Sequence, residues 1–516
     1  MSRTQENNKK IAKNTLFLYI RSIIILTVSI YTSRVVLAAL GINDYGIYNI
    51  VGGFVSVFSI LSSSLVNASQ RFISYEMGKA CPETGKVFSS ALTVHVVLAI
   101  VVFVLIESIG LWFLNYKINI SPDRIYAANW VFHCSALTFS INLIIIPFTA
   151  TIIAHERMDA FAYIGIFEVC AKLAIVYILF SLSTDKLITY AVLMVLVVIL
   201  LATIYVVYCG HRFQECVISF HYDRKVVGSM LSFSGWNFVG TTAGILSTHG
   251  INILVNLFWG VAFNAARGIA EQVNAAINSF VSNFMTAINP QITKNYASGN
   301  YTYMNELMVR GAKYATLLYW LISLSIFIEA DYILNLWLVD VPSYSVVFLR
   351  LVIIYSIFQA LSNSLYIGML ATGRIKTYQL IMGSITGFSF ILCYIFFKIG
   401  LGPEWSYIST IITVFVCMFA RLILMEKMIA YFSGWYFFKN AIVKSFIVII
   451  LSVGIVSYAK AQIGLTGMSS FLTTCFLTLL IVPIFSYVFG FDYKERTVFA
   501  ARVNEKFNHL KDGKNS

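Results

Sequence analysis

The chain has 516 residues, of which 59% are hydrophobic and only 11% are charged. Soluble domains carry roughly 25% charged residues, and a chain this apolar could not hide its hydrophobic surface from water in a soluble core. The net charge of +13 does not indicate nucleic acid, because the sequence has no aromatic and basic module of the kind that binds it. The composition predicts an all-α polytopic membrane protein.

Windows of about 20 mainly apolar residues, the length of a helix that crosses a bilayer, recur along the whole sequence. They predict fourteen transmembrane helices, at 15–40, 46–67, 87–114, 125–149, 161–182, 187–209, 228–258, 262–289, 312–337, 346–370, 379–400, 405–425, 441–460 and 469–490. Several connections, such as 183–186 and 402–404, are only a few residues long. Neighbouring helices are therefore expected to run antiparallel, in a bundle without a large domain outside the membrane.

The N-terminal tail, residues 1–14, is basic, and we expect no cleavable signal because the apolar stretch after it is too long for one. Lys and Arg are concentrated in this tail and in the connections that lie on the same side of the membrane. Cytoplasmic loops carry such an excess of positive charge. An even number of spans also returns the basic tail 491–516 to that side, so both termini are predicted to be cytoplasmic.

An internal repeat relates the two halves of the chain. Tyr75 and Tyr296 follow small polar residues near the end of a span, and they lie 221 positions apart, as do Asn142 and Asn363. Six spans return the chain to its starting side, so the repeat is parallel, with its axis along the membrane normal. The predicted domains are a tail 1–14, an N-lobe 15–210, a linker 211–227, a C-lobe 228–425, two extra helices within 426–490 and a tail 491–516.

Polar side chains at helical spacing mark the face of a membrane helix that is turned away from lipid. Such stripes follow the first, second, seventh and eighth spans, and a weaker one follows the fourth. Small and polar residues also join helices by close packing and hydrogen bonds, which can explain Asn, Ser and Gly. Packing does not require a charge, so Arg34, Arg267 and Glu271 are expected to line a water-accessible cavity between the lobes.

The candidate cavity residues are Tyr31, Arg34, Asn49, Lys172, Asn237, Arg267, Asn274 and Asn278, with Glu168 and Glu271 as candidates for ion coupling or charge tuning. Lys172 and Glu168 lie four residues apart in one span, so they form either a structural ion pair or part of a cavity site. Glu329 lies near the outer end of a span, where an acidic side chain can reach the lipid headgroups.

Enzymatic chemistry finds no support in the sequence. It contains no Walker A sequence, metal motif or nucleophile elbow, and no loop large enough to carry the acidic or His residues of a membrane glycosyltransferase or polymerase. The sequence thus predicts a transporter without a cofactor. Its energy would come from an ion gradient, H⁺ or Na⁺, or from consumption of the product, since nothing in it is built to bind ATP.

Three segments resemble one family. The first is "KNTLFLYIRSIIILTVSIYTSRVVLAALGINDYGIYNIVGG", with Leu-Gly at 40–41 and Tyr-Gly at 45–46, and the others are "IPFTATIIAHERMDAFAYI" (146–164) and "NPQITKNYASGN" (289–300). Over its whole length the chain resembles the Wzx-type oligosaccharide-lipid flippases of bacterial envelopes. That family belongs to the MOP superfamily, which includes the MATE drug exporters and the lipid II flippases. The resemblance implies two six-helix lobes plus two C-terminal helices.

The resemblance also implies a function. Such a protein moves undecaprenyl-diphosphate-linked oligosaccharide from the inner to the outer leaflet of the bacterial cytoplasmic membrane, for O-antigen, capsule or exopolysaccharide, by alternating access. Arg34 and Arg267 would then bind the diphosphate, with Lys172 as a weaker third cation, and Glu271 would tune Arg267 or carry a coupling proton. Its partners would be this substrate, membrane lipids and polysaccharide polymerase or other assembly proteins, without nucleic acid.

Two alternatives remain open. A MATE-like cation-coupled antiporter of drugs or metabolites shares the fold but would favour acidic cavity residues, whereas the expected cavity offers at least as many bases as acids. A polysaccharide-processing membrane enzyme is the second alternative, and the missing catalytic loop argues against it.

Overall fold

The computed structural model describes most of the chain as helix, and no strand occurs in the residues that it describes. Those residues are 3–56, 58–116, 122–181, 184–219, 223–338, 341–493 and 495–497. The side chains of some of them, Arg34 and Asn49 among them, lie outside the description. Within the described part, eleven helical segments are long and apolar enough to cross a membrane, so the chain is a multi-pass membrane protein, as its composition predicts.

The contacts divide the chain into two units. Unit 1 comprises Met1–Ile245, Thr286–Met304 and Ile367–Ser384, and unit 2 comprises Leu246–Met285, Asn305–Tyr366 and Ile385–Ser516. Helices α8, α9, α10, α12 and α13 contribute residues to both units. The lobe boundaries derived from the sequence repeat stay a prediction.

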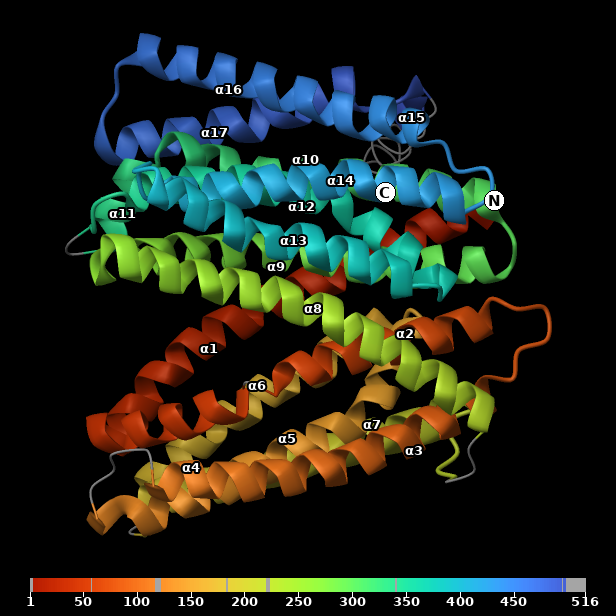
Figure 1. The fold of residues 1–516 in the computed structure, drawn as a ribbon, viewed down its shortest axis with the longest axis vertical. Helices are drawn as coiled ribbons and strands as arrows, with labels where there is room; N and C mark the ends of the chain where they lie inside the picture. The colour runs from red at the N-terminus through yellow and green to blue at the C-terminus, as the bar shows by residue number, and fades with distance from the viewer. Residues whose placement is uncertain are drawn as a thin grey trace, which may run out of the picture. The chain divides into compact units, whose positions relative to one another are not determined.

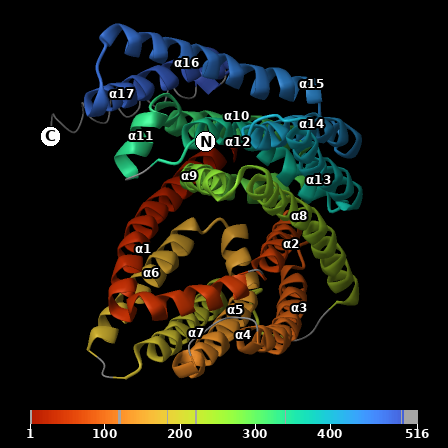
Figure 2. The same ribbon diagram turned by 60° about the vertical axis from the view of Figure 1, so that its left-hand side comes forward.

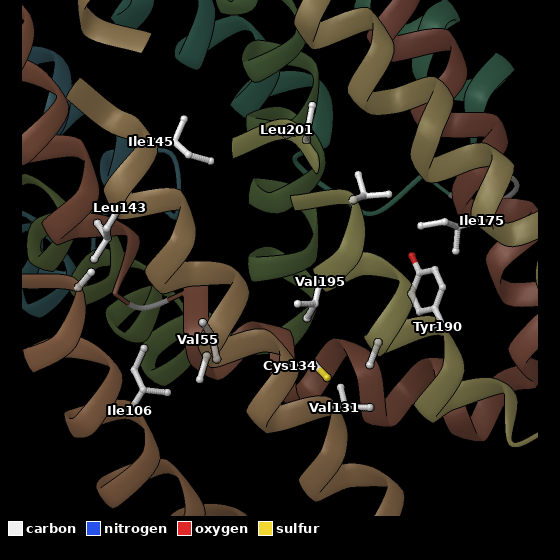
Figure 3. Close-up of a cluster of buried hydrophobic side chains, with 14 of the residues drawn as sticks. Val55, Ile106, Val131, Cys134, Leu143, Ile145, Ile175, Tyr190, Val195 and Leu201 are labelled. Atoms are coloured by element: carbon white, nitrogen blue, oxygen red, sulfur yellow. The ribbon is translucent and has the colours of Figure 1, made fainter. Parts of the chain in front are cut away.

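The first half of the chain supplies most of unit 1. Its elements are α1 (Arg3–Ser56), α2 (Ser59–Met77), α3 (Thr84–Leu105), the π-helix η1 (Ile106–Gly110), α4 (Leu111–Tyr116), the 3₁₀ turn η2 (Pro122–Arg124), α5 (Ile125–Ala154), α6 (Met158–Phe180) and α7 (Lys186–Arg212). α5 packs along α7 and α3, while α1 packs along α6 (Figure 1). Val55, Val131 and Leu201 belong to the apolar core that these helices share (Figure 3).

The second half begins with the two long helices α8 and α9. Its elements are α8 (Arg224–Trp259), α9 (Val261–Ala297), α10 (Tyr301–Ile328), α11 (Ala330–Trp337), α12 (Ser345–Thr372), α13 (Lys376–Lys398), α14 (Trp405–Met428), α15 (Gly434–Phe437), the π-helix η3 (Phe438–Val443), α16 (Lys444–Ile463), α17 (Gly467–Phe485) and the π-helix η4 (Ser486–Gly490). A turn with Gly464 and Gly467 at positive φ joins α16 to α17, which pack against each other (Figure 2).

Helices occupy all fourteen predicted spans. The three predicted spans outside these eleven segments, 15–40, 46–67 and 262–289, coincide with α1, with the end of α1 together with α2, and with α9. The predicted span 312–337 is not one continuous helix, because it is broken between α10 and α11 at Glu329.

The predicted first turn is confirmed at Gly41. The segment assigned as α1 is two helices joined at this residue, whose φ of 79° and ψ of 169° are not helical. A backbone with these angles is essentially restricted to glycine, because a side chain would meet its own backbone there. Gly41 therefore sets the point at which the first span ends.

Glu329 does not reach out to headgroups, as its position near a span end suggests, but is buried at 4% exposure. Its carboxylate lies 2.8 Å from Lys460 Nζ and accepts hydrogen bonds from Ser470 Oγ at 2.8 Å and Thr474 Oγ1 at 2.9 Å. The helix break at Glu329 thus provides a polar contact between α16, α17 and the rest of unit 2, beside the hydrogen bond from Trp320 Nε1 to Ser452 Oγ.

The segment expected to link the lobes, 211–227, belongs to unit 1. Phe213 stacks on the imidazole of His155, with 4.1 Å between ring centroids, and His155 also pairs with the carboxylate of Glu215. The hydrogen bond from His155 lowers the pKa of Glu215 below its ordinary value, although partial burial opposes this.

Gly41→Ala is expected to lower the free energy of unfolding by about 1–3 kcal/mol, because alanine is strained at this backbone conformation. Gly210→Ala is the matched control, since Gly210 lies within α7 and a Cβ at either glycine would meet no other atom. Thermal unfolding of both variants in the same detergent measures the difference. Equal melting temperatures would contradict the strain at Gly41.

Glu215→Gln is expected to remove part of the acid sensitivity of the fold. Because the folded protein lowers the pKa of Glu215, this group's stabilisation is complete above its ordinary pKa of 4.5 and is lost as the pH falls through the lowered value. Between about pH 6 and about pH 3, the wild type should lose about 2–4 °C more in Tm than Glu215→Gln. Glu83→Gln, in an exposed ion pair with Lys86, should behave as the wild type does.

Candidate functional site

A buried cation lies in unit 2. Arg267 of α9 is 3% exposed, and its Cζ atom lies 4.4 Å from the centre of the Tyr407 ring of α14. A desolvated cation–π contact of this kind is worth about 2 kcal/mol. Among the described residues, Arg267 Nε and Nη1 have no hydrogen-bond acceptor, and leaving a buried donor unsatisfied costs about 1–3 kcal/mol.

The same tyrosine holds Glu271. Its hydroxyl donates to Glu271 Oε1 at 3.0 Å, so Tyr407 contacts the cation through its ring and the carboxylate through its hydroxyl. Arg267 and Glu271, which the sequence places on one face of a helix, are thus both in contact with one buried side chain.

Asn274 and Asn278 lie further along α9 in a network of neutral groups. The side-chain oxygen of Asn274 accepts hydrogen bonds from Tyr319 at 2.9 Å, Ser356 at 2.8 Å and Asn278 at 2.9 Å. Three donors leave no lone pair of that oxygen for a ligand. In this arrangement the asparagines join α9 to α10 and α12, which is the packing alternative considered from the sequence.

Unit 1 contains two cavities, of about 190 and 210 Å³. Tyr48 lines both, while Tyr190 and Cys134, which also belong to the apolar core of Figure 3, line one each. Ser135, Thr138 and Asn142 of α5 also line the larger cavity. The smaller cavity is lined by Ser29, Thr32, Val36, Tyr45, Tyr48, Val169, Lys172 and Tyr190. Among the described residues, no Asp or Glu lines either cavity.

The polar side chains of α5 make the larger cavity a site for water or a polar ligand. Ser135, Thr138 and Asn142 form no hydrogen bond with another described residue, and the Asn142 side chain is exposed. An unsatisfied amide or hydroxyl that faced lipid would cost several kcal/mol. These groups therefore indicate a wet, neutral, hydrogen-bonding surface inside unit 1.

The remaining candidates of unit 1 have partners of their own. Lys172 Nζ lies 2.5 Å from Glu168 Oε1, so this pair is formed, and Lys172 also lines the smaller cavity. The Tyr31 hydroxyl is 2.7 Å from that of Tyr177, and Asn237 Oδ1 accepts from Gln379 Nε2 at 2.9 Å. For the other two candidates, Arg34 and Asn49, the structure describes only the backbone, which lies within α1.

Sequence reasoning missed Tyr407, because an aromatic residue in an apolar run looks like an ordinary core position. It also missed Tyr45, Tyr48 and Tyr190, which line the smaller cavity. Their hydroxyls could have indicated a polar cavity only if it had been known which helix faces meet. Within the described residues, no cluster of His, Cys, Asp or Glu side chains is placed to hold a metal ion.

A charged turn between α5 and α6 ties predicted N-lobe residues to α9 within unit 1. Glu156 has a φ of 59°, unusual for a residue with a side chain, and is 2% exposed. Its Oε1 atom accepts from Gln291 Nε2 and from Lys294 Nζ, each at 2.8 Å, while Asn14 Nδ2 donates to its backbone carbonyl at 3.0 Å.

A second connection within unit 1 involves Arg71 of α2. Its guanidinium lies 4.6 Å from the ring centres of Phe72 and Tyr75 and donates to the carbonyl of Ala371 at the end of α12 at 3.1 Å. A cation at this position also complements the negative end of the helix dipole. The repeat-related pair Tyr75 and Tyr296 lie with ring centroids 6.3 Å apart.

Comparison with solved structures identifies the fold. A multidrug resistance MATE family transporter of the MOP superfamily superimposes with a TM-score of 0.69 at 12% identity, over 80% of this chain and 95% of that chain. A MOP superfamily transporter from Pyrococcus furiosus gives 0.68 at 12% identity, over 81% and 96%. The MATE transporter ClbM in complex with Rb⁺ gives 0.67 at 14% identity, over 81% and 95%.

The chain has the MATE fold. The family resemblance read from the sequence is confirmed at this level, that of the MOP superfamily fold. No model of a protein family matches the sequence, and no curated protein matches it. The solved structures leave about a fifth of the chain uncovered.

Glu156→Gln is expected to destabilise the protein by about 3 kcal/mol, because it removes the carboxylate of a buried ion pair. The double variant Glu156→Gln with Lys294→Met should recover much of the loss, since the partly buried cation is then also gone. Lys86→Met removes an exposed ion pair and should change the free energy of unfolding by less than about 1 kcal/mol. Thermal unfolding of the four proteins tests this, and a double variant no better than Glu156→Gln would contradict it.

Proposed function

We propose that the protein is a flippase that carries a lipid-linked oligosaccharide, joined to its polyprenyl carrier by a diphosphate, from the inner to the outer leaflet of the bacterial cytoplasmic membrane by alternating access. The observation that carries the proposal is Arg267, a buried cation with two N–H groups that have no acceptor among the described residues. Planar guanidinium groups bind phosphate oxygens in pairs.

The chemistry of the substrate accounts for such an arginine. A diphosphate that crosses the low-dielectric layer loses its water, and charge-assisted hydrogen bonds can replace it. Arg34 and Arg267 act as diphosphate ligands and Lys172 as a weaker cation in this proposal. The neutral hydroxyls and amides of the unit 1 cavities suit the sugar moieties.

A cation-coupled antiporter is the main competing function. The fold is compatible with it, because MATE transporters share this architecture. Glu271 and Glu168 are the acidic candidates it would use, and each lies against a neutralising or hydrogen-bonding partner. For the MOP superfamily transporter from Pyrococcus furiosus, a binding pocket of reverse polarity suggests a different function. The charge of the pocket is therefore the property to test in this protein.

The decisive experiment measures on which leaflet lipid-linked oligosaccharide accumulates after deletion of the gene. Spheroplasts and inverted vesicles are labelled with a membrane-impermeant glycan-binding probe. We expect a complete repeat unit to accumulate on the inner leaflet, with wild-type protein restoring export. Arg34→Ala and Arg267→Gln should each lower the export rate roughly tenfold or more, because a charge-assisted hydrogen bond is worth about 1.5–3 kcal/mol.

Arg350→Gln is the matched control, since Arg350 lies at an exposed position of α12 and donates to the Phe327 carbonyl. It should restore export as the wild type does. If Arg34→Ala and Arg267→Gln are stably expressed and export normally, the assignment of these two arginines as diphosphate ligands is wrong. An unchanged leaflet distribution together with altered drug or ion tolerance would move the protein to the antiporter function.

A further inference from the structure

Arg267 and Glu271 are four residues apart on α9, yet neither side chain takes part in an ion pair with a described residue. Residues at this spacing are neighbours on a helix, and oppositely charged ones attract each other. Burial strengthens that attraction, because the protein interior screens charge less than water does. Something in the structure must hold the two charges apart.

Tyr407 of α14 is that element. Its ring lies against the Arg267 guanidinium, with 4.4 Å from Cζ to the ring centre, and its hydroxyl donates to Glu271 Oε1 at 3.0 Å. The ring is 1% exposed and packs on Phe348 of α12, with 5.5 Å between centroids. A side chain so enclosed has a fixed orientation, and so do its two charged partners.

The arrangement leaves two buried donors of Arg267 without an acceptor among the described residues. An aromatic ring attracts a cation through its face, and the N–H groups at the edge of the guanidinium are not used in that contact. Arg267 Nε and Nη1 have no acceptor in the described part of the chain. The carboxylate that could satisfy them is engaged by the tyrosine hydroxyl instead.

We propose that Tyr407 is a positioning residue that holds Glu271 away from Arg267 and so keeps two buried guanidinium N–H groups unpaired, for an anionic phosphate group to bind during the transport cycle. This inference rests on the proposed function and deepens it, since it explains how a buried arginine next to a glutamate can still bind the substrate diphosphate. The shared chemistry is a phosphate oxygen pair, which a prenyl diphosphate or a soluble pyrophosphate can supply.

The test measures binding of farnesyl diphosphate and, separately, of inorganic pyrophosphate to the full-length protein in lipid nanodiscs. Tyr407→Phe keeps the ring but frees Glu271 to pair with Arg267, so we expect binding to weaken roughly tenfold. Glu271→Gln should bind at least as tightly as the wild type. Tyr407→Phe combined with Glu271→Gln should return to within roughly twofold of Glu271→Gln, because no competing carboxylate remains.

Tyr314→Phe is the control for loss of a tyrosine hydroxyl in unit 2, because its ring packs on Phe491 and it lies outside the proposed site. Thermal unfolding of every variant shows whether it is folded. Recovery in the double variant distinguishes positioning from a structural role. If the hydroxyl were only structural, its loss would weaken binding both with Glu271 and in Glu271→Gln.

The outcomes separate this inference from the proposed function. If the wild type binds farnesyl diphosphate and Tyr407→Phe binds it equally well, the role of Tyr407 is overturned and the flippase proposal stands. The same conclusion follows if Tyr407→Phe weakens binding but the double variant does not restore it. Binding of pyrophosphate alone, with the expected variant pattern, supports the role of Tyr407 but rejects the lipid diphosphate. Binding of neither probe overturns both.

Discussion

The hydrocarbon core of a membrane contains no water, so a polar group within it must find its partner in the protein or lose several kcal/mol. Most of the buried polar groups described above obey this constraint. Glu329 is surrounded by Lys460, Ser470 and Thr474, and the Asn274 oxygen accepts three hydrogen bonds. Two N–H groups of Arg267, with no acceptor among the described residues, and the side chains of Ser135, Thr138 and Asn142, which form no hydrogen bond with another described residue, are positions where a ligand or water can supply the partner.

The same rule decides how charges are distributed. Ion pairs such as Glu156 with Lys294 and Lys172 with Glu168 neutralise each other and leave little net field. Arg267 is different, because its countercharge is held by a tyrosine hydroxyl rather than by the guanidinium itself. The proposed anionic cargo rests on this difference, because the guanidinium N–H groups that Glu271 does not engage can bind phosphate oxygens.

The contacts within unit 1 bear on movement as well as on stability. Glu156 with Lys294, and Arg71 with Ala371, connect residues that the sequence repeat assigns to different lobes. In the proposed alternating access one repeat moves against the other, and such contacts would form and break during the cycle.

The sequence by itself determined the helical class, the order of the spans and the turn at Gly41, because bilayer thickness and positive φ leave direct local signals in the residues, while the repeat stays a prediction. It also indicated that Arg267 and Glu271 share a helix face, since helical spacing is a local property. Only the tertiary structure decided that Tyr407 stands against both, that Asn274 is saturated by three donors, and that Glu329 is buried rather than turned to the headgroups. These facts depend on which helix faces meet, and residues more than a hundred positions apart in an apolar sequence carry no local signal of that.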